Sequence, residues 1–323
     1  MMRLLRASLL VASAFAAPQS YAADAYPTRP LRMIIPFPPG GGTDIMGRMV
    51  AQRFAEGLGI QVVVDNRGGA GGLIGTELAA RASPDGHTLM IGSVSTICIN
   101  PSLHKNLTFD PGKDLAPISL VASTPSMLVV GATVPVKSVK DLVALAKSKP
   151  GQLTYATPGS GSSSHLGTEL FKEAAGVDIL HVPYKGTGPA ITDVVSGQVT
   201  MFISNIPSVL PMVKAGRLRA LAVTSLQRTA LRPDLPTVAE SGIPGFEVIV
   251  WYGVLAPAGI PRPILTRLNQ EVRKMSTMQD VKDRLATQGA EVITSTPEEF
   301  GARIRADRAK WEKIVKLSGA KPE

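Results

Sequence analysis

Cysteine is nearly absent from the sequence, and aromatic residues and histidines are scarce. The single cysteine, Cys98, allows no intramolecular disulfide, and it follows the apolar run 88–91 so closely that we expect a small buried residue. Phe, Trp and Tyr make up 5% of the chain, too little for a surface that stacks single-stranded nucleic acid. The four histidines have no paired spacing such as H-x-x-x-H. The sequence therefore predicts no metal site, no cofactor and no nucleic-acid partner.

The sequence also has no block of like charge. Its 34 lysines and arginines outnumber its 25 aspartates and glutamates, which gives a formal net charge of +9, but the basic residues are scattered. A scattered basic surface is typical of soluble proteins and modestly favours the approach of anionic solutes. The charge is therefore a bias toward small anions and does not mark a site.

The N-terminus has an apolar run that is too short to span a bilayer. This run, 9–17, falls well short of the ~20 residues that a membrane anchor needs. Arg3 and Arg6 precede it, and small residues that fit an A-x-A-like cleavage site follow it around Ala22. We therefore expect residues 1–22 to be a cleaved signal peptide and the mature protein to be free in a bacterial periplasm.

The rest of the sequence contains a regular alternation of short apolar strands and amphipathic helices. In the first part of the chain we expect strands at 31–36, 61–64 and 88–91, with helices between them at 45–58 and 73–82. This β-α-β-α-β order predicts a parallel sheet with helices on its faces.

The alternation restarts in the second part of the chain. The further strands expected there are 153–156, 179–182, 200–203, 220–223 and 291–293, and the helices are 141–147, 189–196, 261–276 and 297–317. Two long extended runs, 120–130 and 246–255, are placed to connect two domains. The predicted fold class is therefore α/β, with domain 1 formed by 26–124 plus 249–323 and domain 2 by 125–248. Each domain is expected to be a mixed, mostly parallel sheet flanked by helices.

Two glycine-rich loops follow strands and open helices. The stretch "PFPPGGGTDIMGR" (36–48) contains the first loop, and "PGSGSSSHL" (158–166) contains the second. The amides at a helix N-terminus bind anions, and glycines let a ligand approach them closely. A dinucleotide fingerprint fails because Ile45 stands at its third glycine position, and a P-loop fails because Arg48-Met49 replaces the lysine and hydroxyl. The loops therefore indicate a small anion such as a carboxylate.

Three alternatives stay open on the residues alone. Asp44 either stabilises the first turn of its helix or accepts a hydrogen bond from the ligand. Trp251 and Tyr252 either line a cleft or fill the core, and the core is favoured. The alternative function is an exported serine hydrolase of a small ester or amide. However, Ser163 has His165 where a G-x-S-x-G elbow needs glycine, and no third catalytic residue is found.

Six blocks of the sequence point to a known family. In chain order they are "YPTRPLRMIIPFPPGGGTD", "VVVDNRGGAGGLIGTELAARASPDGHTL", "YATPGSGSSSHLGTELFKEAAG", "HVPYKGTGPAITDVVSGQV", "GRLRALAVTS" and "WYGVLAPAGIP". They resemble the extracytoplasmic solute receptors of tripartite tricarboxylate transporters, the Bug or TctC family that is abundant in Bordetella and its relatives. The resemblance covers nearly all of the chain from Tyr26 onward.

The resemblance implies a type II-like, two-domain periplasmic binding protein with a ligand cleft between its domains, and no enzyme. Such receptors bind a small carboxylate or related polar solute and deliver it to the permease subunits of their transporter; we expect a monomer. Ser204 departs from a form of the family that has an aspartate there, which disfavours a ligand with an amine. The ligand-binding residues that the resemblance predicts are Phe37, Gly42, Thr43, Asp44, Ser93, Gly161, Ser162, Ser163, Ser164, Ser204 and Asn205.

Overall fold

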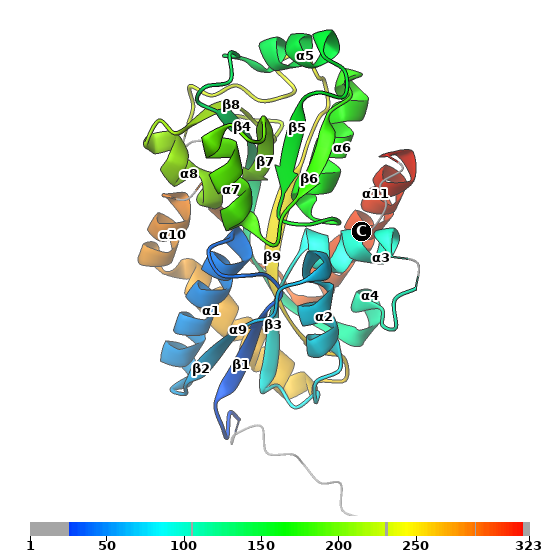
Figure 1. The fold of residues 1–323 in the computed structure, drawn as a ribbon. Helices are drawn as coiled ribbons and strands as arrows, with labels where there is room; N and C mark the ends of the chain where they lie inside the picture. The colour runs from blue at the N-terminus through cyan, green and yellow to red at the C-terminus, as the bar shows by residue number, and fades with distance from the viewer. Residues whose placement is uncertain (1–25, 105, 230–231, 288, 319–323) are drawn as a thin grey trace, which may run out of the picture.

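The structure is a computed structural model that describes residues 26–104, 106–229, 232–287 and 289–318. The predicted signal peptide lies outside these described residues. Two α/β domains lie one above the other in Figure 1, with the green segments of domain 2 above the blue and cyan segments of domain 1. In the described part of the chain, no helix combines the length and the apolar character that a membrane crossing requires.

Domain 1 is built on three parallel strands in the order β2 (Val62–Asn66), β1 (Leu31–Ile35) and β3 (Thr88–Ser93). The helices α1 (Gly42–Leu58) and α2 (Leu73–Ala80) connect them. They lie on opposite faces of the sheet because the two right-handed crossovers run in opposite directions across it (Figure 1). The parallel β-α-β-α-β order predicted from the sequence is confirmed.

The other elements of domain 1 come from short helical turns and from the C-terminal part of the chain. The turns are η2 (Ala70–Gly72), the π-helical η3 (Ser95–Ile99), α3 (Asn100–Leu103) and α4 (Pro111–Asp114). The C-terminal elements are α9 (Arg262–Thr277), α10 (Gln279–Ala286), β10 (Glu291–Val292) and α11 (Pro297–Ser318). α9 packs beside α1, and α11 packs against η3. The turns after β3 and α10 were not predicted from the sequence.

Domain 2 repeats the alternation of strands and helices. Its strands are β5 (Thr154–Thr157), β6 (Leu180–Pro183), β7 (Met201–Asn205) and β8 (Leu218–Val223), and its helices are α5 (Val139–Ser148), α6 (Ser163–Ala175), α7 (Thr187–Ser196) and α8 (Ile206–Lys214). β5 pairs in parallel with both β6 and β7. The sheet of this domain is mixed, because the long strand described next adds antiparallel pairs with β7 and β8; parallel pairs do not predominate as expected.

The long strand β4 (Leu115–Gly131) belongs to both domains. Its first part pairs antiparallel with β9 (Ile249–Pro257), and from Ser126 onward it pairs antiparallel with β7 and β8. At this point the buried Thr224 Oγ1 accepts the Ser126 N–H at 2.7 Å and donates to the Val248 carbonyl at 2.6 Å. The Thr224 side chain therefore joins the two segments that pass between the domains, β4 and the segment that leads into β9. This change of partner coincides with the predicted domain boundary, whose exact limits stay a prediction.

Apolar periodicity anchors α1 on the sheet. Met46, Met49, Val50 and Phe54 recur at helical spacing and are all buried, and Gly59 ends the helix in a left-handed conformation with φ 67°. Each such side chain contributes about 1.5–3 kcal/mol when it leaves water. The N-terminus of α1, which follows the first glycine loop, is therefore held in a fixed place.

Candidate functional site

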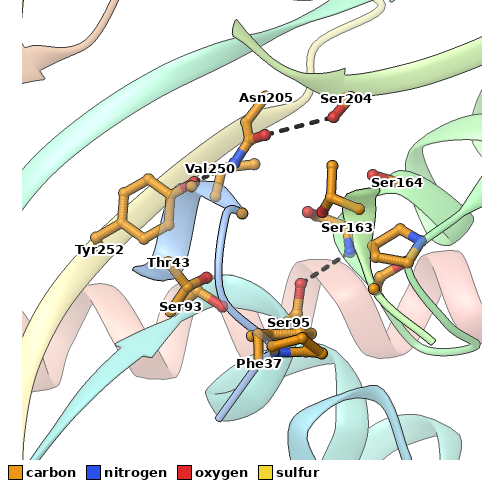
Figure 2. Close-up of a pocket in the computed structure, with 17 residues that line it drawn as sticks. Phe37, Thr43, Ser93, Ser95, Ser163, Ser164, Ser204, Asn205, Val250 and Tyr252 are labelled. Atoms are coloured by element: carbon orange, nitrogen blue, oxygen red, sulfur yellow. Dashed lines mark hydrogen bonds between the residues drawn. The ribbon is translucent and has the colours of Figure 1, made fainter. Parts of the chain in front are cut away.

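A small cavity of about 40 Å³ lies between the domains. Its wall is formed by the loop before α1, the end of β3, the turn η3, the loop before α6, the start of α7, the end of β7 and the middle of β9 (Figure 2). The lining residues are Phe37, Pro38, Gly41, Gly42, Thr43, Ser93, Ser95, Pro158, Ser162, Ser163, Ser164, Gly186, Thr187, Ser204, Asn205, Val250 and Tyr252.

Four helices begin at this cavity, one from domain 1 and three from domain 2. α1, α6, α7 and α8 are 17, 13, 10 and 9 residues long, and each helix start carries about half a positive charge. Ser162 Oγ caps α6 by accepting the His165 N–H at 3.2 Å, whereas α1, α7 and α8 have no side-chain cap. The four N-cap residues, all on the cavity wall, are Gly41, Ser162, Gly186 and Asn205. The cavity therefore presents a positive potential and backbone N–H groups.

None of the side chains that line this cavity carries a formal charge at neutral pH. Its polar side chains are the hydroxyls of serine, threonine and tyrosine and the amide of Asn205. Such donors, together with helix N-termini, neutralise a carboxylate without a lysine or arginine. An ammonium group would find no carboxylate partner on this wall. The chemistry of the cavity therefore suits reversible binding of a small anion.

Nine of the eleven residues predicted to bind the ligand lie on the wall of this one cavity, and they come from both domains. They are Phe37, Gly42, Thr43, Ser93, Ser162, Ser163, Ser164, Ser204 and Asn205. The other two, Asp44 and Gly161, lie outside the lining. The structure thus brings the two glycine-rich loops together, and contact with a ligand stays a prediction for each residue.

Asp44 does not line the cavity and takes part in a hydrogen-bond network at the start of α1. Its carboxylate accepts hydrogen bonds from the Gly40 N–H at 3.0 Å, from Asn66 Nδ2 at 2.9 Å and from Arg48 Nε at 3.0 Å. Burial raises the pKa of this carboxyl, but the hydrogen bonds from Arg48, Asn66 and Gly40 outweigh burial and leave the pKa below its usual value. Asp44 therefore stabilises the start of α1, and of its two predicted roles the structural one agrees with these contacts.

Gly161 lies behind the wall and shapes the loop before α6. Its N–H donates to His165 Nδ1 at 3.2 Å. Its φ of 76° is left-handed, and a Cβ at this position would come within 2.6 Å of Asn100 Oδ1. Only glycine fits this close approach between the domains.

His165 is buried at the end of an aromatic stack beneath this loop. Its ring lies 4.2 Å from the ring of His181, which lies 4.9 Å from the ring of Tyr155. Burial, with smaller effects of His181 and Lys172, lowers the pKa of His165 to about 3. The imidazole is therefore a neutral, weak base, and Ser162 Oγ contacts the backbone N–H of His165 and not its ring. This arrangement does not provide the activated serine that the hydrolase alternative needs.

Ser95 and the α7 start are cavity residues that sequence reasoning missed. Ser95 Oγ accepts the Ser163 N–H at 2.8 Å, a hydrogen bond between the domains. Ser95 lies in a π-helical turn that no sequence signal marks. The start of α7 does carry a signal, because Gly186-Thr187 stands just before Pro189, and proline favours the first turn of a helix.

Tyr252 both fills the core and lines the cavity, the two alternatives that the sequence left open. It is 1% exposed, as a core residue would be, yet its hydroxyl reaches the cavity wall and accepts Asn205 Nδ2–H at 2.7 Å (Figure 2). Trp251 points the other way, packs at a right angle to Phe300 and donates from Nε1 to Asp307 at 2.6 Å. Of these neighbours only Tyr252 belongs to the site, because successive residues of a strand face opposite sides.

A second, larger cavity of about 640 Å³ adjoins the first. The two share Phe37, Pro38, Pro158 and Gly186 as walls, and the larger one extends over the glycine-rich loop 68–72. It includes only one of the four helix starts, at Gly186. Size alone favours the larger cavity, but the smaller one is the better anion site because all four helix starts meet there.

Comparisons with known proteins agree with this architecture. The chain matches the model of the tripartite tricarboxylate transporter family receptor, TctC, over residues 46–320. It is 40% identical over 313 residues to protein BugT of Bordetella pertussis (strain Tohama I), an alignment that covers 97% of this chain and 95% of BugT.

Two similar solved structures hold carboxylates. Rpa4515 of R. palustris with adipate gives a TM-score of 0.90 at 38% identity and covers 92% of this chain and 100% of that one. MatC from Rhodopseudomonas palustris with bound malate gives a TM-score of 0.85 at 32% identity and covers 90% of this chain and 100% of that one. These relatives are binding proteins and not enzymes. The chain therefore belongs to the tripartite tricarboxylate transporter family of receptors, the periplasmic solute-binding proteins that include the Bug proteins.

Proposed function

We propose that the protein captures a small carboxylate in the cavity between its domains and delivers it to a tripartite tricarboxylate transporter. The observation that carries this proposal is the meeting of four helix N-termini on a cavity whose lining has no charged side chain. Such a site balances the charge of an anion by dipoles and N–H groups. The adipate and malate of the two similar structures support the same ligand class.

Each domain contributes donors to the carboxylate. The amides of Gly42 and Thr43 at the start of α1 approach it from domain 1, directly or through water. The start of α6 approaches it from domain 2 with the N–H group of Ser164 and the hydroxyls of Ser163 and Ser164, while the Ser163 N–H is held by Ser95 Oγ. Phe37 supplies an apolar wall. Because neither half of the donor set is complete alone, the ligand binds best when the domains are closed.

The hinge of this closure lies where β4 and the segment that leads into β9 pass between the domains. Thr224 joins the backbones at Ser126 and Val248 there, while the hydrogen bond from the Ser163 N–H to Ser95 Oγ spans the cleft. A ligand that contacts both domains shifts the equilibrium toward the closed form by its differential affinity.

The remaining parts of the proposal concern the cell. Residues 1–22 serve as a signal peptide that exports the chain to the periplasm, where the mature protein acts as a monomer. Its partners are the small organic acid and the membrane permease subunits of the transporter. The family name supports the transporter partnership.

A thermal-shift screen of the mature protein tests the ligand class first. The panel holds dicarboxylates, tricarboxylates, aromatic acids, amino acids and pyridine amides. A ligand at about a hundred times its dissociation constant adds roughly 2.7 kcal/mol to the free energy of unfolding. We expect an organic acid to raise the melting temperature and to be recovered unchanged.

The variant Ser163→Asp then tests the site itself by calorimetry with the acid that stabilises most. It places a carboxylate at the first residue of α6, where acidic side chains stabilise a helix but repel an anion in the cavity. We expect loss of binding with the melting temperature preserved. Ser163→Asn is the matched control, with the same shape and no charge. Equal affinity of the Asp and Asn variants would remove this loop from the site.

A further inference from the structure

The glycine-rich loop 68–72 lies between β2 and α2 and takes no part in the small cavity. None of its residues lines that cavity, although all five line the larger one. Its backbone is strained: among the described residues, Ala70 is the one non-glycine residue in the left-handed region, with φ 47°. Such a conformation costs about 1–3 kcal/mol and persists where the surrounding structure holds it, commonly at functional sites. The loop therefore points to a role that the anion cavity does not explain.

The tip of this loop meets domain 2 main chain against main chain. Gly71 has φ 62°, and a Cβ at this position would overlap the carbonyl oxygen of Ser160, which stands in the loop before α6. From the other side, a Cβ on Gly159 would lie 3.8 Å from the Gly71 nitrogen. The two loops are therefore in direct contact through their backbones, and glycine at position 71 permits this approach.

One buried segment of domain 1 supports this contact. Asn100 is 0% exposed and donates from Nδ2 to the Gly71 carbonyl at 3.1 Å, and a Cβ on Gly161 of domain 2 would come within 2.6 Å of its Oδ1. In the preceding turn η3, Ser95 Oγ accepts the Ser163 N–H at 2.8 Å across the cleft. The segment formed by η3 and α3 thus holds the loop in place and adds a second link to domain 2.

The fit at Gly71 controls whether the closed form can be reached. The two sides of the contact belong to different domains, so the contact forms on closure and breaks on opening. Relief of an overlap at Gly71 would require the loops to separate by on the order of 1 Å, since carbon and oxygen atoms need a normal contact distance. That separation would stretch the 2.8 Å hydrogen bond between Ser163 and Ser95 beyond hydrogen-bond range.

We propose that the loop 68–72 is a latch between the domains: the bare Gly71 backbone seats on Ser160, and this contact sets how fully the domains close and how long the carboxylate stays bound. This inference rests on the proposed function, in which closure completes the set of donors. The latch acts through closure and does not contact the carboxylate. Its loss should therefore weaken the binding of different acids by the same factor.

The test compares Gly71→Ala with Gly59→Ala. Gly59 ends α1 with φ 67°, close to the 62° of Gly71, so alanine meets a similar backbone strain at both positions. A Cβ on Gly59, however, would meet no atom within 4 Å. Melting temperatures measure the shared strain and show that each variant is folded. Calorimetry measures the affinity for the dicarboxylates, tricarboxylates and aromatic acids of the thermal-shift panel, with adipate and malate first.

Double electron–electron resonance measures closure directly. Spin labels are attached at two exposed positions, one in each domain, through Ser83→Cys and Ser196→Cys. The single native cysteine, Cys98, is buried, so the labels attach at the two introduced positions. The distance between the labels is measured for each protein without ligand and at saturation.

We expect the domains of the wild-type protein and of Gly59→Ala to approach when an acid binds. Gly71→Ala should lose affinity about tenfold or more for every acid that binds, and its domains should approach less. Full closure of Gly71→Ala at saturation, or equal affinities of the two alanine variants, would overturn the latch. Tight binding by the wild-type protein without any approach of the domains would also overturn it while the proposed function stands. If none of the acids binds, both proposals fail.

Discussion

The pH dependence of stability tests whether His165, in the aromatic stack beneath the second glycine loop, is neutral in the folded protein. His165 is 4% exposed, and burial beside His181 and Lys172 lowers its pKa from 6.5 to about 3. The folded protein therefore resists protonation of this ring, while the unfolded chain takes up a proton near pH 6.5. By linkage, stability falls as the pH drops from about 6.5 toward 3, and it is fully present above this range.

The expected loss follows from the two pKa values. Each pH unit inside the window costs up to about 1.4 kcal/mol, so lowering the pH from 7 to 5 should reduce the free energy of unfolding by about 2 kcal/mol through His165 alone. The variant His165→Asn keeps an acceptor for the Gly161 N–H but does not titrate. It should be less stable at pH 7 and lose about 2 kcal/mol less than the wild-type protein between pH 7 and pH 5.

Urea denaturation at constant ionic strength, at pH 5, 6 and 7, measures this difference. Carboxylates with lowered pKa values also lose stability in acid, but they are the same in both proteins and cancel. Thr168→Val, also in α6, serves as a control, since it removes the buried hydrogen bond to the Ser164 carbonyl without removing a titrating group. It should keep the wild-type pH dependence. The same pH dependence for His165→Asn and wild-type protein would refute a neutral, buried His165.

Three further substitutions probe the site, the core and the hinge. Gly42→Ala should lower carboxylate affinity at least tenfold in calorimetry, because its Cβ overlaps the Asn205 amide; unchanged affinity would mean that this close approach does not matter for binding. Phe54→Ala should lower the free energy of unfolding by about 3–5 kcal/mol in urea melts and leave affinity unchanged, since Phe54 is buried away from the cavity. Thr224→Val should lower the free energy of unfolding by about 1–3 kcal/mol, because it leaves the Ser126 N–H unpaired. A loss below about 0.5 kcal/mol would contradict the role of Thr224 in joining the two segments between the domains.

Local patterns in the sequence predicted most of the elements. The strands and helices of the β-α-β-α-β segment follow from the apolar period, because a side chain's burial depends on its position within its own element. α8 was not predicted, because its prolines form a local pattern that is typical of loops. Pro207 and Pro211 both lie within it and argue against a helix, yet Pro207 occupies the first turn, where proline is tolerated, and α8 packs against β4, β7 and β8.

The two glycine loops were found as separate features of the sequence, and their chemistry as anion-binding loops follows from their local order of strand, glycine and helix. The hydrogen bonds of Asp44 were not predictable in this way. Its partner Asn66 lies 22 residues away on β2, and only the parallel pairing of β1 with β2 brings Asn66 to the start of α1. Local sequence therefore left two roles for Asp44, and its tertiary neighbours favour one.

The sequence by itself thus determined the α/β alternation, the two glycine-rich loops and the preference for a small anion, because each depends on a few adjacent residues. Only the tertiary structure decided which groups share the cavity. β4 had to change partners at Ser126 for the starts of α7 and α8 to join those of α1 and α6, and β9 had to lie between β3 and β4 for the Tyr252 hydroxyl to reach Asn205. These contacts join residues far apart in the chain, and strand pairing that no local pattern encodes sets their geometry.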